Sequence, residues 1–307
     1  MKGNRERVLA ALRFESGAGV PYEIGFNKGA LEKMVRRTGD RDFARHTGSH
    51  LSIVSLSAPE TQFRPGFFRD EYGVVWNRSG ADRDVGNIEG QVVGSLEELE
   101  NYRPPAVDRA WVLSRAKALS ELDDGNFHVA QLHFSVFERA WSLCGMENLL
   151  IWMLDEPEAV RGFLDKITSR CLEVLETSFT YPYDCVYTGD DWGQQRGLIM
   201  GPPLWREFIK PCFERIYGLC HAHGRFTAHH SCGDLRDILM ERPGMGLDIY
   251  QTFQPEIYGL ETAALLRGRL SVWGGISTQR DLPFLSPEDI RALVKRKIGR
   301  ASCRERV

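Results

Sequence analysis

Short apolar segments alternate with helical stretches along most of this chain, and this alternation restricts the fold more than any other feature. Strands that alternate with helices form a parallel sheet with helical crossovers. The predicted strands lie at Val20–Phe26, Ser49–Leu56, Phe127–Phe134, Asp184–Thr188, Phe226–His230, Asp248–Phe253 and Leu270–Gly275. They are one short of the eight strands of a (β/α)8 barrel. We therefore predict an α/β fold, a TIM barrel truncated before its eighth strand.

Two segments depart from the alternation. A Gly/Asp/Arg-rich turn separates Tyr72–Asn77 from Ile88–Val93, which predicts a β-hairpin insertion near residues 70–95. The last ten residues, 298–307, resemble a translated sequencing adapter, so we predict a non-native tail there and a native C-terminus that is missing. Cys303 lies in this tail and has no expected role. With no repeat or low-complexity linker, residues 1–297 are predicted to form a single, C-terminally incomplete domain.

Composition and charge narrow the function classes. A net charge of −3 gives no reason to expect nucleic acid or an anionic membrane as partner. No apolar run is long enough to span a bilayer, and the charged start has no signal-peptide core behind it. The seven cysteines have no paired spacing, which favours a reducing, cytoplasmic location over a disulfide framework.

The motif His229-His230-Ser231-Cys232-Gly233 closes one predicted strand. Because side chains two apart on a strand point to the same side, His230 and Cys232 should project together. An imidazole and a thiol at a strand end are suitable zinc ligands. The alternative is that both are buried structural residues, since free cysteine is often simply part of a core. His229, on the opposite face, is expected to pack against a helix.

Polar side chains also follow the other predicted strands, at the end where α/β barrels place their active sites. Asp190 and Asp191 are candidate catalytic carboxylates, one as a general base and the other as a substrate or metal ligand. The alternative is that one caps the next helix and the other faces solvent. Candidate substrate-binding residues at these ends are Trp192, Gln194, Arg196, Gln254 and Trp273.

Taken together, these segments resemble the uroporphyrinogen decarboxylase superfamily over nearly the whole chain up to Lys297. The resemblance is carried by Arg5–Leu12, Gly189–Gly193, Trp205–Pro211, His230–Gly233, Phe253–Glu256 and Trp273–Ile276. It implies a (β/α)8 barrel and either of two chemistries: cofactor-free decarboxylation of uroporphyrinogen, or zinc-dependent methyl transfer to or from a corrinoid. Decarboxylases carry an Arg-Gln-Ala-Gly-Arg segment after the first strand, where this chain reads Glu23–Lys28.

The resemblance therefore favours a zinc-dependent methyltransferase that acts with a corrinoid-binding protein and a small-molecule methyl donor or acceptor. It implies that His230 and Cys232 bind zinc and that a further cysteine ligand lies near the C-terminus, in the missing region. Two alternatives stay open. One is uroporphyrinogen III decarboxylation in porphyrin biosynthesis, and the other is a non-catalytic barrel that binds a tetrapyrrole or corrinoid.

Overall fold

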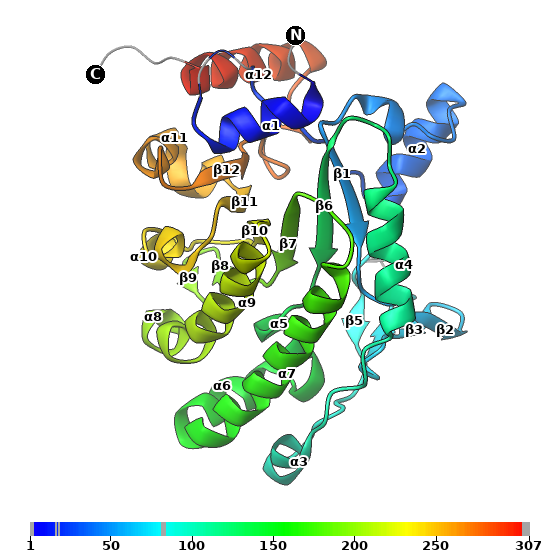
Figure 1. Cartoon of the computed structure of the whole chain (residues 1–307), viewed down its shortest axis with the longest axis vertical. Helices are drawn as coiled ribbons and strands as arrows, with labels where there is room; N and C mark the ends of the chain where they lie inside the picture. Colours follow the sequence, from blue (N-terminus) through cyan, green and yellow to red (C-terminus); the bar gives the residue numbers. More distant parts are fainter. Residues whose placement is uncertain (1–2, 16, 18, 81–83, 303–307) are drawn as a thin grey trace.

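A six-stranded parallel sheet forms the centre of the computed structural model, which describes residues 3–15, 17, 19–80 and 84–302 (Figure 1). Its strands, in spatial order, are β1 (Leu51–Ser55), β6 (Phe127–Leu132), β7 (Cys185–Gly189), β10 (Phe226–His230), β11 (Ile249–Phe253) and β12 (Ser271–Gly274). The predicted parallel α/β architecture is confirmed. Among the described strands the ladder ends at β1 and β12, so a closed barrel stays a prediction.

Helices flank the sheet, and in Figure 1 α4, α7 and α9 run beside one another along it. The longer helices are α1 (Asn4–Leu12), α2 (Lys28–Thr38), α4 (Arg109–Ser120), α5 (Phe137–Cys144), α6 (Met146–Asp155), α7 (Pro157–Ser178), α9 (Lys210–Ala222), α11 (Pro255–Leu266) and α12 (Pro287–Ser302). Shorter ones are α3 (Leu96–Asn101), α8 (Gly201–Leu204) and α10 (Arg236–Leu239), with 3-10 turns at Arg45–Thr47 and Arg242–Met245 and a π-helical turn at Trp205–Ile209. Local sequence sets several ends; for example, the Asp108 carboxylate caps α4 by accepting the Trp111 N–H at 2.9 Å.

The two faces of the parallel sheet pack into separate apolar cores. Ala130 and Val186 belong to the larger core, beneath the flanking helices. Their neighbours along the strands point the other way and form a smaller core that Val8 and Leu9 of α1 cover. Ala228 lies in this smaller core. His230, two residues later on the same strand, therefore lies on the same face of the sheet.

The predicted first strand, Val20–Phe26, is wrong as a strand, although the segment runs beside the start of β1. Two of its backbone N–H groups donate to side chains and not to a neighbouring strand. The Tyr22 N–H donates to His50 Nδ1 at 3.1 Å, and the Ile24 N–H donates to Ser49 Oγ at 3.2 Å. The apolar side chains that suggested a strand are exposed, Tyr22 by 45% and Ile24 by 48%. Six parallel strands are thus described where seven were predicted.

The predicted insertion is larger than a hairpin. A four-stranded antiparallel sheet is made of β2 (Thr61–Arg64), β3 (Phe67–Arg69), β4 (Val75–Asn77) and β5 (Asn87–Ile88). Only β4 and β5 correspond to the predicted hairpin, and residues 81–83 of its turn lie outside the described residues.

Two buried arginines fasten this insertion to the helices of the main body. Arg139 of α5 pairs with Asp70 at 2.6 Å, and Arg170 of α7 pairs with Glu71. Both guanidinium groups also lie over the ring of Tyr72, at 3.9 and 4.4 Å from its centroid. Desolvated pairs of this kind fix the orientation of the insertion, because breaking one leaves a buried charge without a partner.

None of the described helices combines the length and the apolar character needed to cross a bilayer.

Candidate metal centre

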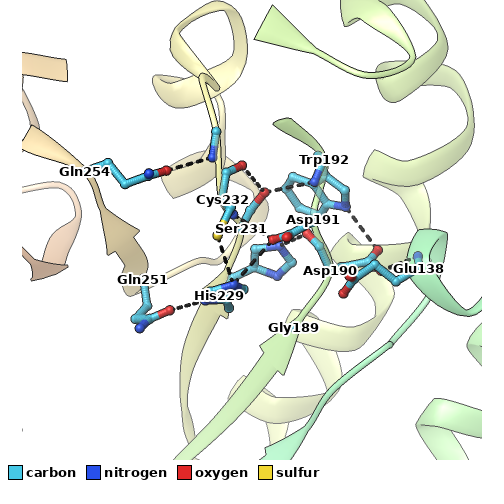
Figure 2. Close-up of polar contacts among 12 residues, drawn as sticks. Glu138, Gly189, Asp190, Asp191, Trp192, His229, Ser231, Cys232, Gln251 and Gln254 are labelled. Carbon is cyan, nitrogen blue, oxygen red and sulfur yellow. Dashed lines mark hydrogen bonds and ion pairs between the residues drawn. The ribbon is translucent and has the colours of Figure 1, made fainter. Parts of the chain in front are cut away.

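Three metal-binding side chains meet at the carboxyl ends of two neighbouring strands. One donor atom each from Asp191, His230 and Cys232 lies within 4.8 Å of the others. Figure 2 shows Asp191 and Cys232 on the neighbouring turns that carry them. The His230 Nε2 atom is 3.5 Å from Cys232 Sγ and 3.4 Å from Asp191 Oδ1. All three residues are half-buried, so they are ordered by packing yet still reachable from solvent. The expectation that His230 and Cys232 project together is confirmed.

The parallel pairing of β7 with β10 brings these residues together. In this ladder His230 lies opposite Gly189, so the turns that follow the two strands start at the same level. The Cys232 N–H donates to Asp191 Oδ1 at 2.7 Å and ties the turns to each other. A Cβ atom on Gly233 would stand 2.3 Å from the carbonyl carbon of Gly193, so the turns approach this closely only because both residues are glycines.

His230 is held from behind by groups on two other strands. Its Nδ1 atom hydrogen-bonds to Oε1 of Gln251, and the Tyr187 hydroxyl donates to the same oxygen at 2.8 Å. Sequence reasoning missed both Gln251 and Tyr187. Strand alternation could have suggested Gln251, since it lies on the predicted strand that follows His230 in the chain and ends at the same edge of the sheet.

The two adjacent aspartates have separate environments. Asp190 is fully buried, and its carboxylate accepts the Phe137 N–H at 2.8 Å, the Glu138 N–H at 2.6 Å and the Trp192 indole N–H at 3.0 Å. It therefore caps the start of α5, which precedes it in the chain, and not the next helix that the alternative named. Burial raises the pKa of the Asp190 carboxyl, and the three N–H donors oppose this rise. Asp191, with a side chain 36% exposed, faces His230 and Cys232.

Burial and neighbouring charge shift the other titratable groups around the cluster. Burial, with the Asp190 and Asp191 carboxylates beside it, raises the pKa of Glu138 above its usual range. Burial and the nearby His230 lower the pKa of His133 to about 4, which keeps this imidazole neutral near pH 7. Burial, followed by Asp191, raises the pKa of the Cys232 thiol to about 12 in the metal-free protein.

Four of the five predicted substrate-binding residues are placed in three different ways. Gln254 supports the metal cluster, because its Oε1 accepts the Gly233 N–H at 2.8 Å (Figure 2). Trp273 is half-buried, with its ring centroid 5.1 Å from that of Tyr187. Gln194 and Arg196 are exposed on the short hairpin of β8 (Gly193–Gln194) and β9 (Gly197–Leu198).

Trp192, the fifth predicted substrate-binding residue, lies in the core. Its indole is fully buried, with 0% of its surface exposed, and it stacks on His229 at 4.1 Å between ring centroids. It therefore belongs to the core beneath the site, where its indole N–H holds Asp190. His229 packs edge-on against Phe213 of α9, which confirms that it points away from the site toward a helix.

The donor set suits zinc. Zinc is borderline-soft and binds thiolate, imidazole and carboxylate ligands, and catalytic sites commonly use three protein ligands with one position left open. Asp191, His230 and Cys232 supply one ligand of each kind within a single cluster. The carboxylate of Asp191 is thus available as a third donor, whereas the further cysteine implied by the resemblance stays a prediction.

Comparison with known proteins gives one family and one fold. The sequence pattern of the uroporphyrinogen decarboxylase (URO-D) family matches residues 81–304. No curated protein matches the chain. Among solved structures, a methyltransferase from Methanosarcina mazei is similar to this chain with a TM-score of 0.73 and 18% sequence identity, over 97% of this chain and 90% of that one. At this identity, the likeness concerns the fold.

Proposed function

Because this chain belongs to the uroporphyrinogen decarboxylase family, we propose that it is a zinc-dependent methyltransferase that acts with a corrinoid protein. The observation that carries the proposal is the meeting of Asp191, His230 and Cys232 at one sheet edge. The similar structure from Methanosarcina mazei is a methyltransferase, which agrees with this proposal at the level of the fold.

Each residue of the cluster has a definite part in this proposal. His230 Nε2, Cys232 Sγ and an oxygen of Asp191 would hold the ion, and Gly193 and Gly233 let the two turns come close enough to do so. Bound zinc lowers the pKa of a thiol ligand or acceptor, so that the nucleophilic form exists near neutral pH. Asp190 fixes the backbone beside Asp191, and Trp273 offers an aromatic surface next to Tyr187 for the methyl donor or acceptor.

Decarboxylation of uroporphyrinogen fits the site less well. Asp191 and Glu138 lie at the cluster, and Glu23, which stands in the segment where decarboxylases carry arginines, hydrogen-bonds to Trp273. A substrate with eight carboxylates would meet the Asp191 carboxylate here and would lack the arginines that compensate such charge. Decarboxylation predicts turnover without metal, so metal dependence separates the two chemistries.

The first test is the zinc content of the purified protein by elemental analysis. We expect one zinc per chain in the native protein, its loss in Cys232→Ala, and its retention in Cys220→Ala, a matched control in α9 whose thiol is fully buried away from the cluster. A native protein that folds and binds no zinc would contradict the proposal.

The second test is methyl transfer itself. Free methylcobalamin as donor and an alkyl thiol as acceptor stand in for the unidentified partners, and the cobalamin spectrum reports loss of the methyl group from cobalt. We expect turnover with native protein and Cys220→Ala, and none with Cys232→Ala. Zinc binding without any methyl transfer would favour the non-catalytic binding barrel.

A further inference from the structure

The hydrogen bonds behind His230 decide which of its two ring nitrogens can bind a metal. A neutral imidazole carries one proton, and only the nitrogen without it has a free lone pair. Nε2 is the atom that faces Asp191 and Cys232. The metal centre therefore requires that the proton stay on Nδ1.

Two groups compete for this proton. On one side, Oε1 of Gln251 is in close hydrogen-bonding contact with Nδ1 and can only accept. On the other side, Asp191 Oδ1 lies 3.4 Å from Nε2 and would draw the proton there if Gln251 did not hold it. A contact of 3.4 Å is long for a charge-assisted hydrogen bond, whereas Gln251 Oε1 is within hydrogen-bonding distance of Nδ1. The proton is therefore held on Nδ1.

The Tyr187 hydroxyl bonds to the end of the Gln251 amide that faces the histidine. This hydroxyl donates to Gln251 Oε1 at 2.8 Å, so the oxygen receives two donors at once. A flipped amide would turn its NH2 group toward Nδ1 and force the proton to Nε2, where it would block the lone pair. Tyr187 is 5% exposed, which shields this bond from water.

The sheet holds this chain of contacts rigid. His230 and Gln251 are paired residues in the parallel ladder of β10 with β11, and Tyr187 lies on β7, at the other side of β10. The Ser231 N–H donates to the Gln251 carbonyl at 2.8 Å and fixes the backbone on which both side chains stand. Supporting side chains that lie on strands hold a metal ligand more firmly than side chains on a loop do.

We propose that Gln251, whose amide oxygen also bonds to Tyr187, is the positioning residue that keeps His230 protonated on Nδ1 and so leaves Nε2 free to bind the metal. The importance of this arrangement for zinc rests on the proposed function, whereas the position of the proton does not. Groups that hold the second nitrogen of a metal-binding histidine raise metal affinity by about 10–100-fold. We expect an effect of this size here.

The proposal is tested with three variants of the full chain. Gln251→Leu removes the acceptor at similar side-chain size, Gln251→Glu keeps an acceptor, and Tyr187→Phe removes only the hydroxyl that bonds to the amide oxygen. The first measurement is the tautomer of His230 in metal-free protein from its imidazole 15N shifts, assigned by comparison with His230→Asn. The second is zinc affinity by competition with a chelator, beside the thermal midpoint of each metal-free variant.

We expect native protein and Gln251→Glu to be protonated on Nδ1 and to bind zinc with similar affinity. Gln251→Leu should move the proton toward Nε2 and weaken zinc binding about 10–100-fold, and Tyr187→Phe, which removes one of the two bonds to the amide oxygen, should give a smaller loss. A Gln251→Leu protein that is folded, stays protonated on Nδ1 and binds zinc as native does would overturn the proposal. If native protein has the expected tautomer but binds no zinc, the proposed function fails while the positioning role of Gln251 stands.

Discussion

Substitution of Gly233 by alanine separates two reasons for a glycine at the metal centre. Gly233 has a φ of +84°, a region in which an L-residue is strained by about 1–2 kcal/mol. In addition, an alanine Cβ would stand 2.3 Å from the Gly193 carbonyl carbon and 2.6 Å from the Gln194 nitrogen, far inside van der Waals contact. Both neighbours are backbone atoms, so the two turns would have to move apart.

The chain offers a matched control at Gly224, which follows α9. Its φ is +68°, close to that of Gly233, but nothing lies within 4 Å of the position that a Cβ would take. Gly224→Ala therefore reports backbone strain alone, which we expect to cost about 1–2 kcal/mol. Gly233→Ala adds the cost of overpacking, about 1–3 kcal/mol, and should destabilise the protein by about 2–5 kcal/mol.

The assay is urea unfolding of the metal-free proteins, followed by zinc titration against a chelator. Separation of the turns would stretch the 2.7 Å bond between the Cys232 N–H and Asp191, so zinc affinity should fall in Gly233→Ala and stay native in Gly224→Ala. Equal losses of stability in the two variants, with unchanged zinc affinity in both, would refute the close-approach reasoning.

Three further substitutions and one alkylation experiment test other parts of the structure. Asp190→Asn places an amide NH2 against N–H donors and should lower the free energy of unfolding by about 1–3 kcal/mol in urea, whereas Asp191→Asn, half-exposed, should lower it by less than about 1 kcal/mol. Asp70→Ala leaves the buried Arg139 without its partner and should cost about 3–5 kcal/mol by the same measurement; a loss below about 1 kcal/mol would show that the insertion is held elsewhere. Because the pKa of Cys232 is raised to about 12 without metal, its thiolate becomes abundant only as pH rises toward that value. Alkylation by iodoacetamide at pH 8, followed by mass spectrometry of the Cys232 peptide, should therefore be roughly a thousandfold slower than for an unperturbed cysteine, and a rate like that of free cysteine would disprove the shift.

The strands with the strongest apolar pattern were predictable because the order of apolar and polar residues within each strand indicates which side chains are buried. Phe226–His230 is a strand with the predicted bounds, and its alternation correctly placed His230 and Cys232 on one side. Val20–Phe26 has a similar apolar content but is not a strand, since its backbone donors bond to side chains of His50 and Ser49. The apolar content of a segment indicates whether its side chains can be buried. It does not indicate which groups its backbone N–H and C=O groups will bond to.

The rest of the metal centre depends on pairing between distant segments. Asp190 and Asp191 are identical neighbours in the sequence, and only the approach of α5 and the Trp192 indole makes one a structural cap. Gln251 reaches His230 because β11 pairs with β10 in one particular register. Neither fact is contained in the local residue pattern.

The contrast between the two aspartates also shows where this site can be redesigned. The residues on both sides of Asp191 are fully buried and hydrogen-bonded, so a new side chain at position 191 would stand on a backbone that is already fixed. A cysteine there would give a softer donor set, which favours thiophilic metals, and an asparagine would remove one negative charge from the cluster. Metal preference could thus be changed by one substitution at position 191, where an asparagine can still accept the Cys232 N–H and a cysteine gives up that bond.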